Sequence, residues 1–424
     1  MRALLSDVQS TPAELVSISA RGVLDSDSGQ LLDRVVVVRG DRVVGVEATH
    51  PEGARIIDLG DKVLAPGLID AHTHILLHGN KGAEEARYQL MEEYPAHRIA
   101  HAVQALRISV EHGFTTIRDL GSEGVGYADI ALRDAVDEGV IEGPRVLVAG
   151  PALSSTGSYP IQHYRPDWAF PSGVQVVDGV DACRRAVREQ VAFGADWIKV
   201  YANAGAGNRV SADGYIDSAP NWTAEELAAI VDEAHAHGRR VAAHATSDVG
   251  VRMAVEAGAN SIEHGYSIRP EVAREMAQRG TYLCPTIIAA DHVVEHRAKE
   301  RGPVWSGVLD VQKRSILNCL EAGVKIVFGT DVGGFPWTQH NQAEEMGFLE
   351  RAGVSPAEIL RSTSTVAAQL LQLEGEIGSL RAGSSADIIA VDGDPRNDLG
   401  VFQDVGFVMH RGRIVRDARG RETS

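Results

Sequence analysis

The residues that could do chemistry stand at the ends of predicted strands. His72 and His74 lie two apart near the end of one strand, so both imidazoles face the same way. His244, His264 and Asp331 each end another predicted strand. Any one of these alone is more typical of a polar strand end bonded to a loop. Together, four imidazoles and a carboxylate form a ligand set that suits zinc or a similar borderline cation.

Lys199 interrupts the apolar strand Trp197-Ile-Lys-Val-Tyr. It could be a strand-end lysine that reaches solvent along its apolar stem. A charged amine inside a barrel would instead be costly, and a buried lysine sheds its proton readily. The neutral amine can capture carbon dioxide as a carbamate, a carboxylate long enough to bridge two metal ions. The bridging role would explain a lysine placed opposite histidines and an aspartate.

The elements that must position these residues follow a regular rhythm. Between 66 and 375, short apolar runs alternate with Ala-, Glu- and Arg-rich stretches, which is typical of βα units and a parallel sheet. Eight such units match an α/β fold, the (β/α)8 TIM barrel, whose active site lies at the carboxyl ends of its strands. The candidate strands begin at Leu68, Thr115, Arg145, Trp197, Val241, Ser261, Tyr282 and Lys325.

The two ends of the chain have a different pattern, with short strands separated by turns. They run from about Val16 to Val63 and from Ala386 onward. Each is too small to bury a core alone. We therefore predict one discontinuous β-sandwich domain from residues 1–65 and 376–424, beside a catalytic barrel of residues 66–375.

Composition narrows the classes of partner. The chain has 424 residues, of which 44% are hydrophobic and 23% charged, and its net charge is −17. This acidic balance argues against nucleic acid or an anionic membrane surface and favours a small-molecule substrate. No apolar run approaches the roughly 20 residues that span a bilayer, and no signal peptide is evident. Three scattered cysteines favour a reduced, cytoplasmic protein.

These motifs resemble the amidohydrolase superfamily in its binuclear, carboxylated-lysine form. Within it the chain is most similar to the prolidase and imidazolonepropionase-like branch, which includes zinc dipeptidases, carboxypeptidases and ochratoxinase-like amidases. The likeness covers nearly the whole chain. It is carried by the run from Pro66 to His74, Lys199, His244, the run from Glu263 to Gly265, and the run from Gly329 to Asp331.

The resemblance implies two divalent metal ions, expected to be Zn²⁺, and a role for each residue. His72, His74 and Asp331 would hold one ion and His244 and His264 the other. Lys199, as N6-carboxylysine formed from carbon dioxide, would bridge them. A hydroxide shared by the ions would attack the substrate carbonyl. Asp331 would be the catalytic base and then the acid that protonates the leaving nitrogen.

The substrate side departs from the family pattern. After the third strand the chain has Ser155-Thr-Gly-Ser-Tyr-Pro where peptidases that resemble it carry a Thr-Gly-Gly-His type loop, and Thr246 replaces a common aromatic. We expect an amide substrate such as a dipeptide, an N-acyl amino acid or an ochratoxin-like amide. Its polar end would meet His163, Tyr164 and Arg165 in the loop after the third strand. Tyr201 and His340 are further candidate substrate contacts, although His340 is more typical of a surface loop.

Two other readings stay open. A mononuclear cyclic-amide hydrolase or deaminase, imidazolonepropionase-like, would leave Lys199 unmodified, and metal content would separate it from a binuclear enzyme. A catalytically silent barrel scaffold would usually lack ligands. A homo-oligomer is also left open. For Arg118 and Asp119 we favour a structural salt bridge over a role as charges that support the metal ligands. The histidines on predicted helices are expected to be unrelated to catalysis: His97, His101, His112, His235 and His237.

Overall fold

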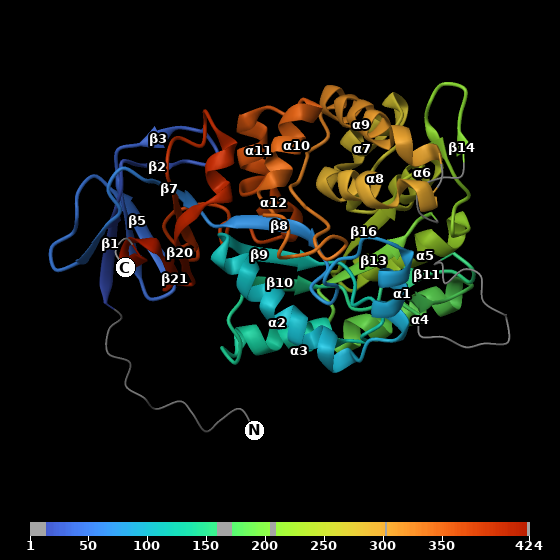
Figure 1. Ribbon diagram of the computed structural model, residues 1–424, viewed down its shortest axis with the longest axis horizontal. Helices are drawn as coiled ribbons and strands as arrows, with labels where there is room; N and C mark the ends of the chain where they lie inside the picture. Colours follow the sequence, from blue (N-terminus) through green and yellow to red (C-terminus); the bar gives the residue numbers. More distant parts are fainter. Residues whose placement is uncertain (1–13, 159–171, 204–208, 302, 422–424) are drawn as a thin grey trace.

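Parallel strands form the centre of the molecule. The computed structural model describes residues 14–158, 172–203, 209–301 and 303–421. One parallel sheet has the order β10-β9-β8, and a second has the order β12-β11-β13-β16-β17-β18 (Figure 1). The strands are β8 Leu68–Thr73, β9 Phe114–Asp119, β10 Arg145–Val148, β11 Leu153–Ser154, β12 Gln175–Val176, β13 Trp197–Tyr201, β16 Arg240–Ala245, β17 Ser261–His264 and β18 Tyr282–Cys284.

Backbone hydrogen bonds link the two parallel sheets on both sides. At one edge, the amide of Asp196 donates to the carbonyl of Val148 over 2.8 Å. At the other, the segment 326–332 lies between β18 and β8, because Ile326 bridges Leu283 and Val332 bridges Thr73, both in parallel. The predicted strand from Lys325 is therefore present as isolated bridges rather than as a regular strand.

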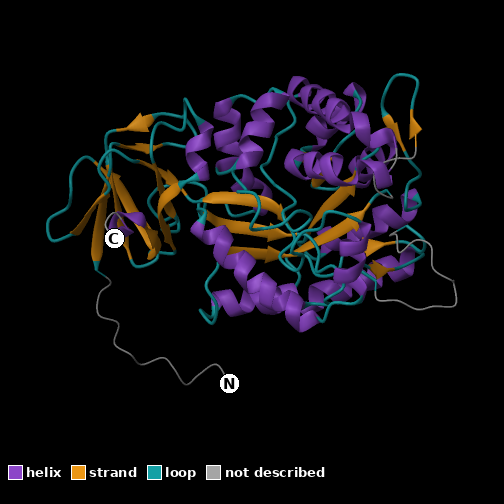
Figure 2. Cartoon of the chain, viewed as in Figure 1, coloured by secondary structure: helices purple, strands orange, loops and turns teal. Residues whose placement is uncertain are grey.

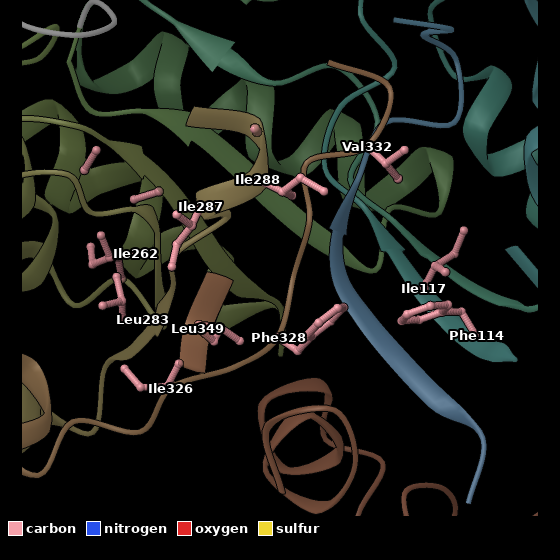
Figure 3. Packing of buried hydrophobic residues seen from close by; sticks show 14 of the residues in the cluster. Phe114, Ile117, Ile262, Leu283, Ile287, Ile288, Ile326, Phe328, Val332 and Leu349 are labelled. Atoms are coloured by element: carbon pink, nitrogen blue, oxygen red, sulfur yellow. The ribbon is translucent and has the colours of Figure 1, made fainter. Parts of the chain in front are cut away.

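Helices cover the outer faces of these sheets (Figure 2). The apolar sides of these helices pack on the strands. In the same core the rings of Phe114 and Phe328 stack, with centroids 5.7 Å apart (Figure 3). Within the described residues, no helix is both long and apolar enough to cross a bilayer. The helices are α1 Ala83–Met91, α2 Pro95–Glu111, α3 Ala128–Asp137, α4 Val180–Phe193, α5 Ala224–Ala236, α6 Asp248–Ala257, α7 Pro270–Arg279, α8 Ile287–Arg301, α9 Val308–Ala322, α10 Glu344–Ala352, α11 Pro356–Ser362 and α12 Thr365–Leu371.

Strands from the two ends of the chain share one sheet. β7 pairs antiparallel with β19, and the sheet order is β21-β20-β19-β7-β2-β3. A second sheet, β5-β4-β1-β6, packs on it through a separate apolar core that includes Ile18, Leu64 and Phe407. The limits of the predicted domains stay a prediction. These strands are β1 Leu15–Ser19, β2 Gly22–Leu24, β3 Leu31–Leu32, β4 Val35–Arg39, β5 Arg42–Glu47, β6 Arg55–Asp58, β7 Val63–Pro66, β19 Ile388–Val391, β20 Val405–His410 and β21 Arg413–Asp417.

Gly79 lets the segment after β8 pass close to the chain beyond Asp331. Its amide donates to the carbonyl of Gly333 over 2.9 Å. Its φ is +88°, and a Cβ there would lie 2.2 Å from the backbone nitrogen of Pro336. Only glycine combines this backbone conformation with so close an approach.

We expect Gly79→Ala to destabilise the fold more than Gly53→Ala does. Gly53 also has a left-handed φ of +77°, but nothing lies within 4 Å of a Cβ there. The control should lose about 1–2 kcal/mol for the left-handed alanine. Gly79→Ala should lose a further 1–3 kcal/mol or so because the Pro336 backbone must move. Chemical denaturation of both variants measures the difference, and equal losses would contradict the close approach.

Candidate active site

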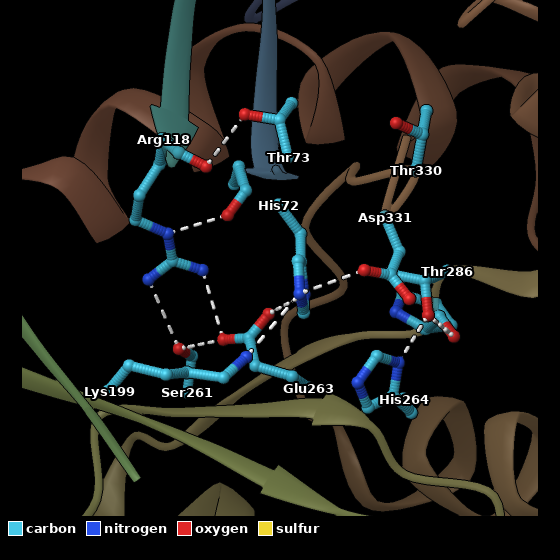
Figure 4. Close-up of polar contacts among 12 residues, drawn as sticks. His72, Thr73, Arg118, Lys199, Ser261, Glu263, His264, Thr286, Thr330 and Asp331 are labelled. Carbon is cyan, nitrogen blue, oxygen red and sulfur yellow. Dashed lines mark hydrogen bonds and ion pairs between the residues drawn. The ribbon is translucent and has the colours of Figure 1, made fainter. Parts of the chain in front are cut away.

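Residues from three predicted strands meet around the carboxylate of Asp331. Asp331 Oδ1 lies 3.1 Å from His74 Nε2 and 3.4 Å from His72 Nε2. From β13, the amine of Lys199 reaches within 3.4 Å of the same His72 Nε2. His72 and Lys199 are fully buried or nearly so. The structure thus brings these four predicted residues together, as Figure 4 shows for His72, Lys199 and Asp331.

The other two predicted histidines complete the cluster. His244 is the last residue but one of β16 and His264 is the last of β17, and their ring centroids are 4.6 Å apart. The ring of His264 also lies 5.0 Å from that of His72. One nitrogen of His72, one of His264 and one oxygen of Asp331 lie within 4.8 Å of one another, which is suitable for a shared cation. All six predicted ligand residues therefore lie in one cluster.

Two of these residues have a backbone conformation that non-glycine residues rarely adopt. The φ angles of His264 and Asp331 are +69° and +61°. Strand alternation alone would turn His264 away from Glu263 and toward the helices, together with Ile262. The left-handed conformation redirects the imidazole. Such strain costs about 1–3 kcal/mol per residue and persists where the surroundings enforce it.

Glu263 is a site residue that the sequence reasoning did not identify. Its Oε2 lies 2.8 Å from His72 Nδ1, and its Oε1 accepts from Arg118 Nη2 over 3.0 Å and from the hydroxyl of Ser261 (Figure 4). Both charged side chains have no exposed surface. The signal was present in β17, because Ser261 and Glu263 are polar at alternate positions and so share a face. Arg118 forms the favoured salt bridge, and its partner contacts a predicted ligand.

Hydrogen bonds at Nδ1 fix the tautomers of two imidazoles. His72 Nδ1 faces the Glu263 carboxylate, which can only accept. His264 Nδ1 lies 2.7 Å from Thr286 Oγ1, and that hydroxyl donates to the carbonyl of Pro285 over 2.7 Å. Each Nδ1 is therefore the protonated nitrogen, and each Nε2 keeps its lone pair. Metal-binding histidines have this arrangement, with the second nitrogen bonded to a carboxylate or another oxygen.

Burial and neighbouring charges favour lone-pair donors in the cluster. Burial, together with nearby positive groups, lowers the pKa of His72 and His264 well below the usual value. Burial also lowers the pKa of Lys199. At His74, burial acts in the same direction, but the hydrogen bond and charge of Asp331 outweigh it and raise the pKa to about 9. Burial thus favours neutral donor nitrogens at His72 and His264, and a divalent cation would take the place of the proton held between His74 and Asp331, so this donor set fits divalent cations.

A second buried carboxylate, Asp70, holds the two ligand-bearing segments together. It accepts from the amide of His72 over 3.1 Å, from the hydroxyl of Thr330 over 2.6 Å and from Gln342 Nε2 over 2.7 Å. Burial raises its pKa to about 6. Because Thr330 precedes Asp331, this carboxylate sets the distance between β8 and the Asp331 backbone. The sequence analysis did not predict a role for Asp70, although Asp70 lies two residues before His72 on the same strand and so faces the same side.

The predicted substrate residues differ in how the structure places them. The ring of Tyr201 lies 4.7 Å from that of His244 and is partly exposed. His340 contacts Glu344 at 3.2 Å and the ring of Phe335 at 5.6 Å. His163, Tyr164 and Arg165 lie outside the described residues. The binding roles of all five stay predictions.

Comparisons with known proteins identify similar sequences and a similar fold. The profile of the Amidohydrolase family matches residues 63–415. The ochratoxinase of Aspergillus niger is 30% identical over 438 residues, which cover 95% of this chain and 86% of that protein. The imidazolonepropionase of Streptomyces avermitilis is 25% identical and covers 92% and 89%. A crystal structure of a prolidase complexed with N-methylphosphonate-L-proline is 32% identical, has a TM-score of 0.83, and covers 95% and 100%.

We expect Arg118→Met to destabilise the protein by about 3–5 kcal/mol, because it leaves the Glu263 charge buried without its cation. The double variant Arg118→Met/Glu263→Gln should regain part of this loss, since no buried charge is left alone. Arg107→Met, which removes an exposed i,i+4 partner of Glu111, is the control and should leave stability unchanged. Denaturant unfolding measures all three. A double variant no more stable than Arg118→Met would contradict the argument.

Proposed function

Since the chain belongs to the amidohydrolase family, we propose that it is a metal-dependent hydrolase that cleaves an amide C–N bond with activated water. The observation that carries the proposal is the convergence on Asp331. Its Oδ1 lies 3.1 Å and 3.4 Å from two imidazole nitrogens, and the buried amine of Lys199 lies 3.4 Å from one of them. This cluster supports hydrolysis because it offers metal ligands and a base at a single place.

We further propose that the two parallel sheets form one (β/α)8 barrel. The segment 326–332 would be its eighth strand, and the hydrogen bond from Asp196 to Val148 would close the other side. In this fold the carboxyl ends of the strands point to one mouth, where active sites lie. Five of the six clustered residues lie at or beside those ends, and Lys199 lies two residues before the end of β13.

The donor set suggests how two ions, expected to be Zn²⁺, would be held. His72, His74 and Asp331 would bind one, and His244 and His264 the other. Lys199 would bridge them after its neutral amine forms a bond to the carbon of carbon dioxide and releases one proton. Burial of Lys199 supports this reaction, because it lowers the pKa of the amine. The carbamate would also supply the negative charge that a buried pair of dications requires.

When bound, two dications would lower the pKa of a water molecule and polarise the substrate carbonyl. The protein's own part is proton transfer. Asp331 would accept the proton of the attacking water and pass it to the leaving nitrogen, so the C–N bond breaks as an amine departs. Its backbone amide donates to the carbonyl of His72 over 2.7 Å, which holds the carboxylate over the reaction site.

For the substrate we propose an N-acyl amino acid or an ochratoxin-like amide in preference to a small dipeptide. Tyr201 lies beside His244, and Tyr266 lies 5.7 Å from His264 and packs against Trp305 at 5.7 Å. These aromatic rings would suit an apolar acyl group. The names of the A. niger relative and of the prolidase complex support an amide bond to an amino acid.

We expect Lys199→Ala to lose binuclear metal binding. The wild type, loaded with zinc and dialysed mildly, should retain two ions at the Asp331 cluster and therefore one or two more ions per chain than the variant, because the variant lacks the bridge. Formate or propionate should restore part of the binding by occupying the bridge. Lys325→Ala, an exposed lysine, is the matched control and should match the wild type. Elemental analysis measures the content, and equal zinc content in the wild type and Lys199→Ala would exclude the bridge. One tight ion in the wild type would favour the mononuclear alternative.

We expect N-aroyl-phenylalanines to be hydrolysed with higher kcat/KM than Xaa-Pro dipeptides, dipeptides with C-terminal Arg or Lys, imidazolonepropionate or lactones. All would be assayed at equal metal loading. Asp331→Asn is the catalytic control and should lower kcat by about 10²–10⁴-fold, because an amide cannot relay the proton. Asp392→Asn, an exposed aspartate, should not change kcat. Activity confined to lactones or imidazolonepropionate would exclude an acyclic amide substrate, and inactivity toward every compound would favour the silent scaffold.

A further inference from the structure

Three histidines surround a buried glutamate at the start of α2. Glu93 precedes the helix, and His97 and His101 follow at intervals of four residues, so all three share one side. His78 comes from the loop after β8. We call these four residues the His78 cluster. It shares no residue with the site around Asp331.

The four side chains form one continuous cluster. His78 Nε2 lies 2.8 Å and 3.1 Å from the two oxygens of Glu93, and His97 Nδ1 lies 2.6 Å from one of them. The ring of His101 stacks on that of His78 with centroids 4.3 Å apart, and lies 4.7 Å from that of His97. One ligand atom each of His78, Glu93 and His101 lie within 4.8 Å of one another.

An ordinary histidine–glutamate ion pair needs only one imidazole beside the carboxylate. His237, directly after α5, pairs with Glu233 at 3.2 Å with the same i,i+4 spacing as His97 and Glu93, but two arginines also pair with that glutamate. In the His78 cluster, by contrast, the Glu93 side chain is only 1% exposed and has three imidazoles around it. Protons on all three rings would repel one another at these separations.

We propose that the His78 cluster is a separate binding site for a transition-metal dication such as Zn²⁺ or Ni²⁺. Three imidazole nitrogens and one carboxylate match the ligands these borderline ions prefer. One cation in place of several protons would neutralise the buried carboxylate and remove the repulsion between rings.

The site would be reachable and exchangeable. The side chains of His78 and His97 are 28% and 57% exposed. His78 also lines a pocket of about 510 Å³ with Gly79, Glu84, Glu85, Tyr88 and Gln89, and the two glutamates add negative charge. A bound ion would join the start of α2 to the loop after β8. That loop leads back to His74, so occupancy would stiffen one wall near the catalytic cluster.

The test is a comparison of nickel binding by the full, untagged chain and its variants. After dialysis against chelator, each protein is saturated with Ni²⁺ and passed through a desalting column, and its nickel content is measured. The wild type should hold one more ion per chain than His101→Ala, and His237→Ala should match the wild type. Whatever the Asp331 site holds cancels in this difference, so the result does not depend on the proposed function.

A second readout and a second variant guard against misfolding. With Cu²⁺ as the probe, the electron paramagnetic resonance spectrum of the wild type should contain a nitrogen-coordinated component that is absent from His97→Gln. His97 is largely exposed, so this substitution should leave the thermal unfolding temperature unchanged. Equal nickel content in the wild type and His101→Ala, or an unchanged copper spectrum in a folded His97→Gln, would overturn the proposal.

Discussion

The buried contact from Arg118 through Glu263 to His72 is the constraint on which the rest of the site depends. These residues come from β9, β17 and β8, so one network fixes three strands relative to one another (Figure 4). The guanidinium of Arg118 also stacks over Trp197 of β13 at 4.3 Å. A buried ion pair is costly unless its hydrogen bonds are satisfied. Here each carboxylate oxygen has a donor, and the direction of the His72 imidazole follows.

Strain at His264 and Asp331 shows how the cluster is completed. A strand that simply alternated would place one of every two neighbouring side chains on the helix side. The left-handed backbone at both residues turns their side chains inward instead. Local hydrogen bonds hold them there: Thr286 contacts the ring of His264, and the carbonyl of His72 accepts the amide of Asp331. The strained backbone at these two residues thus places ligand side chains where regular strands could not place them.

Sequence reasoning worked where chemistry repeats along the chain and failed where partners are distant. Motifs at strand ends predicted the six clustered residues, and the resemblance to amidohydrolases is confirmed. Glu263 was missed because its partners, His72 and Arg118, are 191 and 145 residues away. The positive φ of His264 has no signal in a single sequence. The helical residues His97 and His101 were set aside, since their meeting with His78 depends on the loop after β8.

The contacts around Thr246, where the resemblance to the family predicts an aromatic, involve other parts of the chain. Thr246 forms a unit with Asn203, whose side chain accepts from the Thr246 amide and donates to its hydroxyl, each over 2.8 Å. A Cβ at Gly250 would lie 2.3 Å from the Asn203 oxygen, so this unit also requires the glycine. An aromatic at position 246 would break the hydrogen bond to the hydroxyl without touching the Glu263–His72 contact. The residues around Thr246 can therefore change while the buried Glu263–His72 contact and the residues it positions stay in place.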